Sequence, residues 1–141
     1  MKYAYPIYMA KSGADFLVYI PDMDIFTEGK TPADAICMAR DAIGITGIDM
    51  ENEKEEIPKP TSYEEARNKT IEKADGEDFL YSAGICTLVD VDFLEYRKKM
   101  ENKAVKKNCT IPYWLSVEAD KAGVNYSRVL QEALREKLHM A

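Results

Sequence analysis

Residues 2–10 alternate between two faces, and the apolar run over residues 16–20 follows after a turn, which is the pattern of two β-strands. The first predicted strand is separated from the second by a turn that contains Gly13, so the two form a hairpin. The predicted strands span residues 2–10, 16–20 and 25–27. One face of the first strand carries Tyr3, Tyr5, Ile7 and Met9. Pro6 lacks an N–H donor, so we expect that strand to be irregular or at a sheet edge there.

The alternation then changes to a helical period. Thr31 is a good N-cap, Pro32 suits the first helical position, and Asp34 completes a Thr-x-x-Asp capping box. The apolar positions at helical spacing are Ala35, Ile36, Ala39, Ala42 and Ile43. Gly44 and Gly47 weaken the far end of this predicted helix, because glycine is a poor helix former.

The pattern after the helix predicts a loop, a short helix and a second period-two segment. The expected elements are a solvated loop over 51–60, a helix over 62–69 and a long strand over 79–93. The alternating apolar residues of that strand are Phe79, Tyr81, Ala83, Ile85, Val89, Val91 and Phe93. So long a strand is expected at the centre of the sheet. Residues 95–103 are polar and predict a linker that could begin as a helix, so we divide the chain into domains 1–100 and 101–141.

The second domain reads as strand, helix, turn and helix. Residues 105–111 alternate and are closed by Pro112, and a helix is expected over 113–122. Gly123 suits the end of that helix, and Asn125 caps the next one. The apolar stripe of the last helix is Val129, Leu130, Ala133, Leu134 and Leu138. Each element has one apolar face, and a segment of about 40 residues rarely buries such faces alone.

A two-fold dimer would supply the missing core, with two strands paired as an antiparallel ribbon. The segment therefore resembles the ribbon-helix-helix repressors, whose ribbon enters the major groove of DNA. The predicted dimer core is Val105, Cys109, Ile111, Leu115, Val129, Leu130, Ala133 and Leu134. The predicted base readers are Lys106, Asn108 and Thr110. The predicted phosphate contacts are Lys107, Asn125, Tyr126, Ser127 and Arg128, several of them at a helix N-terminus. A plain helical dimerisation tail is the alternative.

Charge and composition refine this picture. Residues 1–100 carry 12 Lys and Arg against 20 Asp and Glu, a net charge of −8, whereas residues 101–141 carry 7 against 5, a net charge of +2. Such asymmetry indicates different partners for the two halves. Three well-separated cysteines, Cys37, Cys86 and Cys109, are expected to be reduced and buried. No apolar run approaches the ~20 residues of a membrane helix, and no secretory signal is evident, so we expect a cytoplasmic protein.

The order of motifs in the first domain resembles the HicB antitoxin family. These motifs are Tyr19-Ile20-Pro21-Asp22, Phe26-Thr27-Glu28-Gly29, Thr31-Pro32-Ala33-Asp34-Ala35 and Ala39-Arg40-Asp41-Ala42-Ile43. The chain has Asp24-Ile25 where many relatives have a Pro-Gly turn. The resemblance implies an α+β fold, with a partial ribonuclease-H-like first domain followed by the ribbon-helix-helix. It also implies a HicA-type RNA-cleaving toxin as partner and repression of the protein's own operon through operator DNA. We place the toxin contacts at Asp22, Asp24 and Glu28.

Two other function classes stay open. A metal-dependent nuclease would use clustered carboxylates, but the available residues lie at turns and strand ends, which collect Asp without chemistry. They are Asp15, Asp22, Asp24, Asp90 and Asp92. His139 has no evident catalytic partner, and no phosphate-binding loop is present, so we expect no catalytic residue, no metal and no cofactor. The second alternative is a ribbon-helix-helix repressor that senses a small molecule and has no toxin partner.

Overall fold

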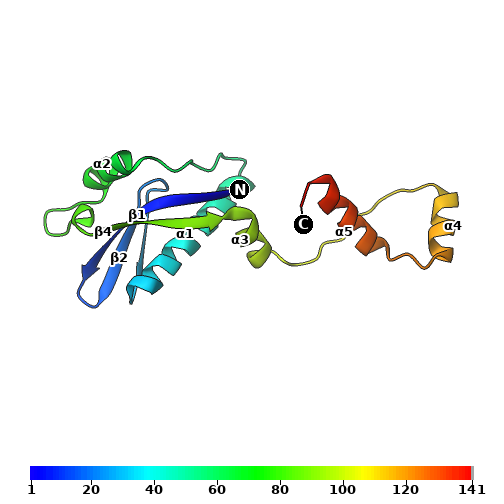
Figure 1. The fold of residues 1–141 in the computed structure, drawn as a ribbon, viewed down its shortest axis with the longest axis horizontal. Coiled ribbons are helices and arrows are strands. Elements are labelled where there is room, and N and C mark those ends of the chain that lie inside the picture. The colour runs from blue at the N-terminus through cyan, green and yellow to red at the C-terminus, as the bar shows by residue number, and fades with distance from the viewer. Residues whose placement is uncertain (141) are drawn as a thin grey trace. The chain divides into compact units, whose positions relative to one another are not determined.

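The computed structural model describes residues 1–140 and divides the chain into two units (Figure 1). The first unit comprises Met1–Lys103 and the second begins at Ala104. The first unit is α+β, as predicted, and is built on a four-stranded antiparallel sheet in the order β3-β2-β1-β4. Its strands are β1 (Lys2–Ser12), β2 (Asp15–Ile20), β3 (Ile25–Gly29) and β4 (Ile85–Asp92).

Helix α1 (Pro32–Asn52) covers one face of the sheet. The Oγ1 atom of Thr31 accepts the N–H of Asp34 at 3.0 Å, which confirms the predicted cap. Alternate residues of the strands point at this helix, as their period of two requires. The buried core on this side is Tyr5, Ile7, Met9, Val18, Ile20, Ala35, Ala39, Ile43, Ile57, Val89, Val91 and Phe93.

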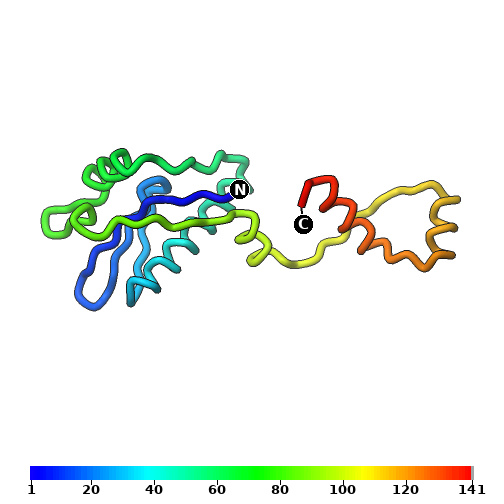
Figure 2. Tube along the Cα trace, in the orientation of Figure 1, coloured from blue at the N-terminus to red at the C-terminus, as the bar shows by residue number. Residues whose placement is uncertain are grey.

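The opposite face of the sheet is covered by α2 (Tyr63–Lys73) and the short 3-10 helix η1 (Tyr81–Ala83). In Figure 2 the chain leaves α1 through the loop of residues 53–62 and then forms α2. The side chain of Ser62 accepts the N–H of Glu65 and begins that helix, which is longer than the predicted 62–69. The sheet therefore lies between two layers of helix (Figure 1).

The prediction of a long central strand over 79–93 is wrong in extent and in place. Only residues 85–92 form β4, and β4 is at the edge of the sheet, whereas β1 is central. The residues before 85 do not continue the strand. Phe79 and Tyr81, whose alternation predicted it, pack their rings against each other outside the sheet, with ring centroids 4.9 Å apart. Pro6 lies in the part of β1 that pairs with β4 alone, since β2 pairs with β1 only from Tyr8 onward. A missing donor is tolerated there.

The two glycines that were expected to weaken α1 instead allow a helix to pack on it. Residues 93–100, predicted as part of the last strand and a linker, form α3 (Phe93–Met100). A Cβ atom on Gly47 would overlap the ring of Phe93, and one on Gly44 would overlap the ring of Tyr96. Helix α1 runs unbroken to Asn52 because this contact compensates for the poor helix propensity of glycine.

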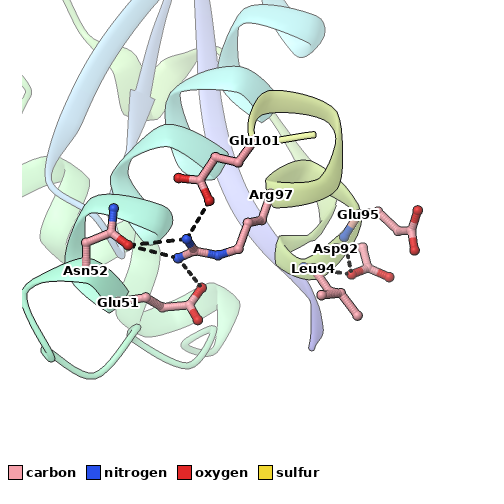
Figure 3. A network of polar contacts seen from close by, with 7 residues as sticks. All are labelled: Glu51, Asn52, Asp92, Leu94, Glu95, Arg97 and Glu101. Carbon is pink, nitrogen blue, oxygen red and sulfur yellow. Dashed lines mark hydrogen bonds and ion pairs between the residues drawn. The ribbon is translucent and has the colours of Figure 1, made fainter. Parts of the chain in front are cut away.

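Polar contacts hold α3 in place at both of its ends (Figure 3). The Asp92 carboxylate accepts the N–H groups of Leu94 and Glu95 and caps the helix. The guanidinium of Arg97 donates to Asn52 of α1 at 3.2 Å and pairs with Glu51 at 3.8 Å and Glu101 at 2.7 Å. The end of the first unit is thereby fixed to α1.

The cysteines are free, but their expected burial is wrong. Cys37 is exposed because it follows Ala35 by two residues on α1, which turns it away from the core. Cys86 is half-buried. Cys109 is exposed in the single chain, and its predicted place in a dimer core requires a second copy.

The second unit consists of an irregular segment and two helices, α4 (Tyr113–Lys121) and α5 (Tyr126–Lys137). Residues 101–112 carry no helix or strand. The predicted strand over 105–111 needs a partner strand from a second chain, so it stays a prediction. None of the residues described in α4 or α5 is buried. Among residues 1–140, no helix is long and apolar enough to cross a membrane.

Candidate functional site

An apolar groove in the second unit is lined by alternate residues of the irregular segment and by the apolar stripe of α5. Its walls are Lys107, Cys109, Ile111, Tyr126, Ser127, Val129, Leu130 and Ala133. Five of the eight predicted dimer-core residues line this groove. Two further predicted core residues are exposed: Leu134 is 49% exposed and Leu115 is 40% exposed. The single chain thus presents an apolar surface that it does not cover.

The three predicted base readers do not line this groove. Lys106, Asn108 and Thr110 are exposed and alternate with the groove residues along the chain. In the predicted strand such neighbours lie on opposite sides, so the polar positions would face away from the apolar ones. Lys107, which is predicted to contact a phosphate, lines the groove with Cys109 and Ile111.

The N-terminus of α5 forms a polar cleft. The Asn125 side chain accepts the N–H of Arg128 at 3.1 Å, and its carbonyl accepts the N–H of Val129. The first N–H groups of a helix have no partner within it, so those of Tyr126 and Ser127 remain for an anion. Arg128 is on the cleft with its guanidinium 4.0 Å from Glu132, and its side chain is 78% exposed.

Tyr126 has a structural contact that the sequence did not reveal. Its hydroxyl donates to the Asp120 carboxylate and, at 3.4 Å, to the Ser116 carbonyl, both on α4. The hydrogen bond to Asp120 raises the pKa of this phenol above its ordinary value. The side chain of Tyr126 therefore joins α5 to α4, which leaves its backbone N–H as the group for the predicted phosphate contact.

The three predicted toxin contacts lie at the β2–β3 turn and along β3. Asp22 is engaged within the fold, where its carboxylate accepts the Thr61 hydroxyl at 2.7 Å. Asp24 has a positive φ of 52°, a conformation that Asp tolerates better than most residues, and accepts the hydroxyl of Tyr19 at 2.7 Å. Burial and that hydrogen bond raise the pKa of Tyr19 above its ordinary value. Glu28 is exposed on β3.

The remaining carboxylates that a nuclease would need are engaged elsewhere. Asp15 pairs with Lys30 at 2.9 Å, Asp90 pairs with Arg40 at 3.2 Å, and Asp92 caps α3. Within residues 1–140, no group of three or more His, Cys, Asp or Glu side chains is placed to hold a metal ion.

An aromatic cluster was missed by the sequence interpretation. Tyr19, Phe26, Phe79 and Tyr81 pack on the sheet face opposite α1, with ring centroids 4.8 Å apart for Tyr19 and Phe26. The sequence feature that could have revealed the cluster is the pair Phe79 and Tyr81, whose alternation also fits the predicted strand over 79–93.

Comparison with known proteins agrees with this architecture. The family model described as "HicB_like antitoxin of bacterial toxin-antitoxin system" matches residues 5–133. The chain is 33% identical over 109 residues to an uncharacterized 14.9 kDa protein of the rep-hol intergenic region of Haemophilus phage HP1 (strain HP1c1), covering 77% of this chain and 72% of that protein.

Two solved structures share the fold. A chain of a toxin–antitoxin complex from Streptococcus pneumoniae is 28% identical, with a TM-score of 0.57, and the match covers 97% of this chain and 99% of that one. The antitoxin HicB of Burkholderia pseudomallei is 24% identical, with a TM-score of 0.50 and 97% of each chain covered.

The class of protein follows from the fold, the uncovered groove and these matches: this is an antitoxin of a bacterial toxin–antitoxin system. The chain belongs to the HicB-like antitoxin family, as the motif order in its first unit predicted.

Proposed function

We propose that this antitoxin has two separate tasks, one for each unit. Its first unit binds and neutralises a HicA-type RNA-cleaving toxin, and its second unit pairs with a second copy as a ribbon-helix-helix that represses the operon. The observation that carries the proposal is the second unit itself. It exposes an apolar groove, buries no residue of α4 or α5, and leaves Lys106, Asn108 and Thr110 exposed.

The DNA-binding role rests on the division of residues 105–111 between two faces. Dimerisation through Cys109, Ile111 and α5 would cover the groove and leave two copies of Asn108 on the outer face of a ribbon. A two-stranded ribbon fits the major groove, where Asn reads adenine and Lys reads guanine. The cleft at the α5 N-terminus, with Ser127 and Arg128, then has the chemistry of a phosphate clamp.

The toxin-binding role rests on family membership and charge. The Streptococcus pneumoniae chain that shares this fold comes from a toxin–antitoxin complex. The net charge of −8 over residues 1–100 suits a basic protein that binds RNA, because complementary fields accelerate encounter. Neither role requires a catalytic residue in this chain, and a nuclease is disfavoured by the separate engagement of its carboxylates.

A paired binding assay tests the two tasks. The intact protein and a variant ending at Lys103 are titrated onto DNA from upstream of the protein's own gene and onto scrambled DNA. They are also added to an RNA-cleavage reaction driven by a purified HicA-type toxin, a small basic protein. We expect only the intact protein to bind the upstream DNA selectively, and both proteins to stop cleavage.

Two results would contradict the proposal. Full RNA cleavage at a saturating concentration of the folded first unit would exclude neutralisation by that unit. DNA affinity that changes with a small metabolite, without toxin binding, would favour a ligand-sensing repressor instead.

A further inference from the structure

The aromatic cluster on the sheet face opposite α1 is only partly covered by the protein's own residues. Phe26 is 55% exposed, although its ring packs 4.8 Å from Tyr19 and 5.7 Å from Tyr81. Leu80, between the two aromatic residues of the 79–81 segment, is 50% exposed. Exposed apolar side chains that gather on one surface are typical of a site where another molecule binds.

Polar contacts hold the two halves of the cluster rigid. The carboxylate of Asp75 accepts the backbone N–H and the hydroxyl of Ser82, and Arg67 of α2 donates to the Ser82 carbonyl at 3.0 Å. On the other half, the hydroxyl of Tyr19 is held by Asp24. A surface that is ordered before it binds loses little conformational entropy on association.

Two carboxylates lie on the segments that carry the cluster. Glu28 follows Phe26 by two residues on β3, so both side chains are on the same face of the sheet. Asp78 lines a groove of about 520 Å³ with Phe79 and Leu80 at the end of the β1–β2 hairpin. Lys11 also lines this groove, and the nearby Lys30 is paired with Asp15 at 2.9 Å. An aromatic centre with a charged rim is the composition of a protein–protein interface.

The sign of the charge at the rim decides which class of molecule can bind there. Aromatic side chains on a sheet also stack on nucleic-acid bases, but the carboxylates of Glu28 and Asp78 would repel the phosphates. A second copy of this chain would place like charges opposite each other, which is unfavourable. A basic protein with an apolar patch on its surface would pack against the aromatic rings and would be attracted by the carboxylates at the rim.

We propose that the aromatic face, defined as Phe26, Phe79, Leu80 and Tyr81 with the buried Tyr19 beneath them and Glu28 at its rim, is the surface that binds the toxin. This inference rests on the proposed function and makes it specific. It moves the centre of the toxin contact away from Asp22, whose carboxylate is used by Thr61, to the exposed ring of Phe26. Large aromatic side chains at the centre of an interface commonly dominate its affinity.

The test uses the full-length protein and a purified HicA-type toxin as the basic protein. Phe26→Ser and Leu80→Ser are each expected to raise the Kd for that protein at least about tenfold. The matched control is Ile45→Ser, which removes an apolar side chain that is 48% exposed on α1, on the opposite face. The control is expected to bind within about twofold of the unsubstituted protein.

A second pair of variants separates the local effect of a rim charge from the effect of the net charge of the protein. Glu28→Lys and Glu56→Lys change the net charge equally, but Glu56 is exposed in the loop after α1. Binding should weaken more for Glu28→Lys, and the difference should shrink at high salt. Thermal unfolding and binding to the upstream DNA confirm that each variant is folded.

The outcomes are distinguishable. If the unsubstituted protein binds the basic protein and Phe26→Ser and Leu80→Ser bind it equally well, the aromatic face is wrong while the proposed function stands. If the two rim variants weaken binding equally, the rim has no local role. If the unsubstituted protein does not bind the basic protein, the proposed function fails and this inference fails with it.

Discussion

The two units of this antitoxin use the same kinds of residue in opposite ways. In the first unit the apolar faces of the sheet and α1 meet each other, so that Tyr5, Val18 and Ile43 are fully buried. In the second unit no residue of α5 is buried, and Val129 on its apolar stripe is 50% exposed. A short helical segment gains too little burial by itself to offset the conformational entropy of folding. We infer that the first unit folds alone, and that the second folds only as it associates.

The strongest test of this contrast is to separate the units. Residues 1–103 should unfold in one transition whose midpoint does not depend on protein concentration. Residues 104–141 should be largely unfolded at low concentration and gain helix as concentration rises, because association stabilises only the folded form. Circular dichroism at concentrations spanning a hundredfold range measures this. A second unit that is helical and monomeric at every concentration would contradict the inference.

Within the first unit, the largest loss is expected at the contact between α3 and α1. Phe93 is 2% exposed and packs its ring on Gly47, so Phe93→Ala should lower the free energy of unfolding by about 3–5 kcal/mol. Urea unfolding of residues 1–103 measures this. Ile45→Ala, on the exposed side of α1, is the control and should change the free energy by about 0.5 kcal/mol or less. Equal losses for the two variants would show that α3 does not form part of the core.

In the second unit, substitutions of polar residues should affect DNA binding and leave stability nearly unchanged. Asn108→Ala should lose about 1–3 kcal/mol of binding to the upstream DNA and keep most binding to scrambled DNA, because it removes a base contact. Arg128→Ala should weaken both and lower the salt slope by roughly one, because it removes a phosphate contact. Titrations at several salt concentrations separate these effects. Unchanged binding by Asn108→Ala would favour a plain dimerisation tail.

The smallest effect is expected at an exposed ion pair of the first unit. The Arg40 guanidinium, which donates to Asp90, holds the pKa of that carboxyl below its ordinary value. A lowered folded-state pKa stabilises the fold above the unfolded pKa, and this contribution is lost as the pH falls through the folded value. Arg40→Met should therefore raise the pKa of Asp90 towards its ordinary value, as measured by an NMR titration. Stability should change little, because the pair is exposed. An unchanged pKa would mean that Arg40 is not the cause.

Local features of this protein could be predicted from the sequence because they depend on residues close together in the chain. The Thr31 cap needs only Asp34, and the Asn125 cap needs only Arg128. The inward face of β1 follows from the alternation of Tyr5, Ile7 and Met9. The division of residues 105–111 into a groove side and a polar side follows from the same period.

Features that join distant segments were decided by the tertiary structure. Gly47 weakens a helix when the sequence is considered alone, yet it makes room for Phe93 when α3 packs on α1. The alternation of Phe79 and Tyr81 predicts a strand, but these rings join Phe26 in a cluster because Gly84 and η1 turn the chain before β4 begins. The period of apolar residues indicates which side of a helix or strand is apolar, and the capping residues indicate where a helix begins. Which element that side meets depends on packing between residues far apart in the chain, and no local pattern records it.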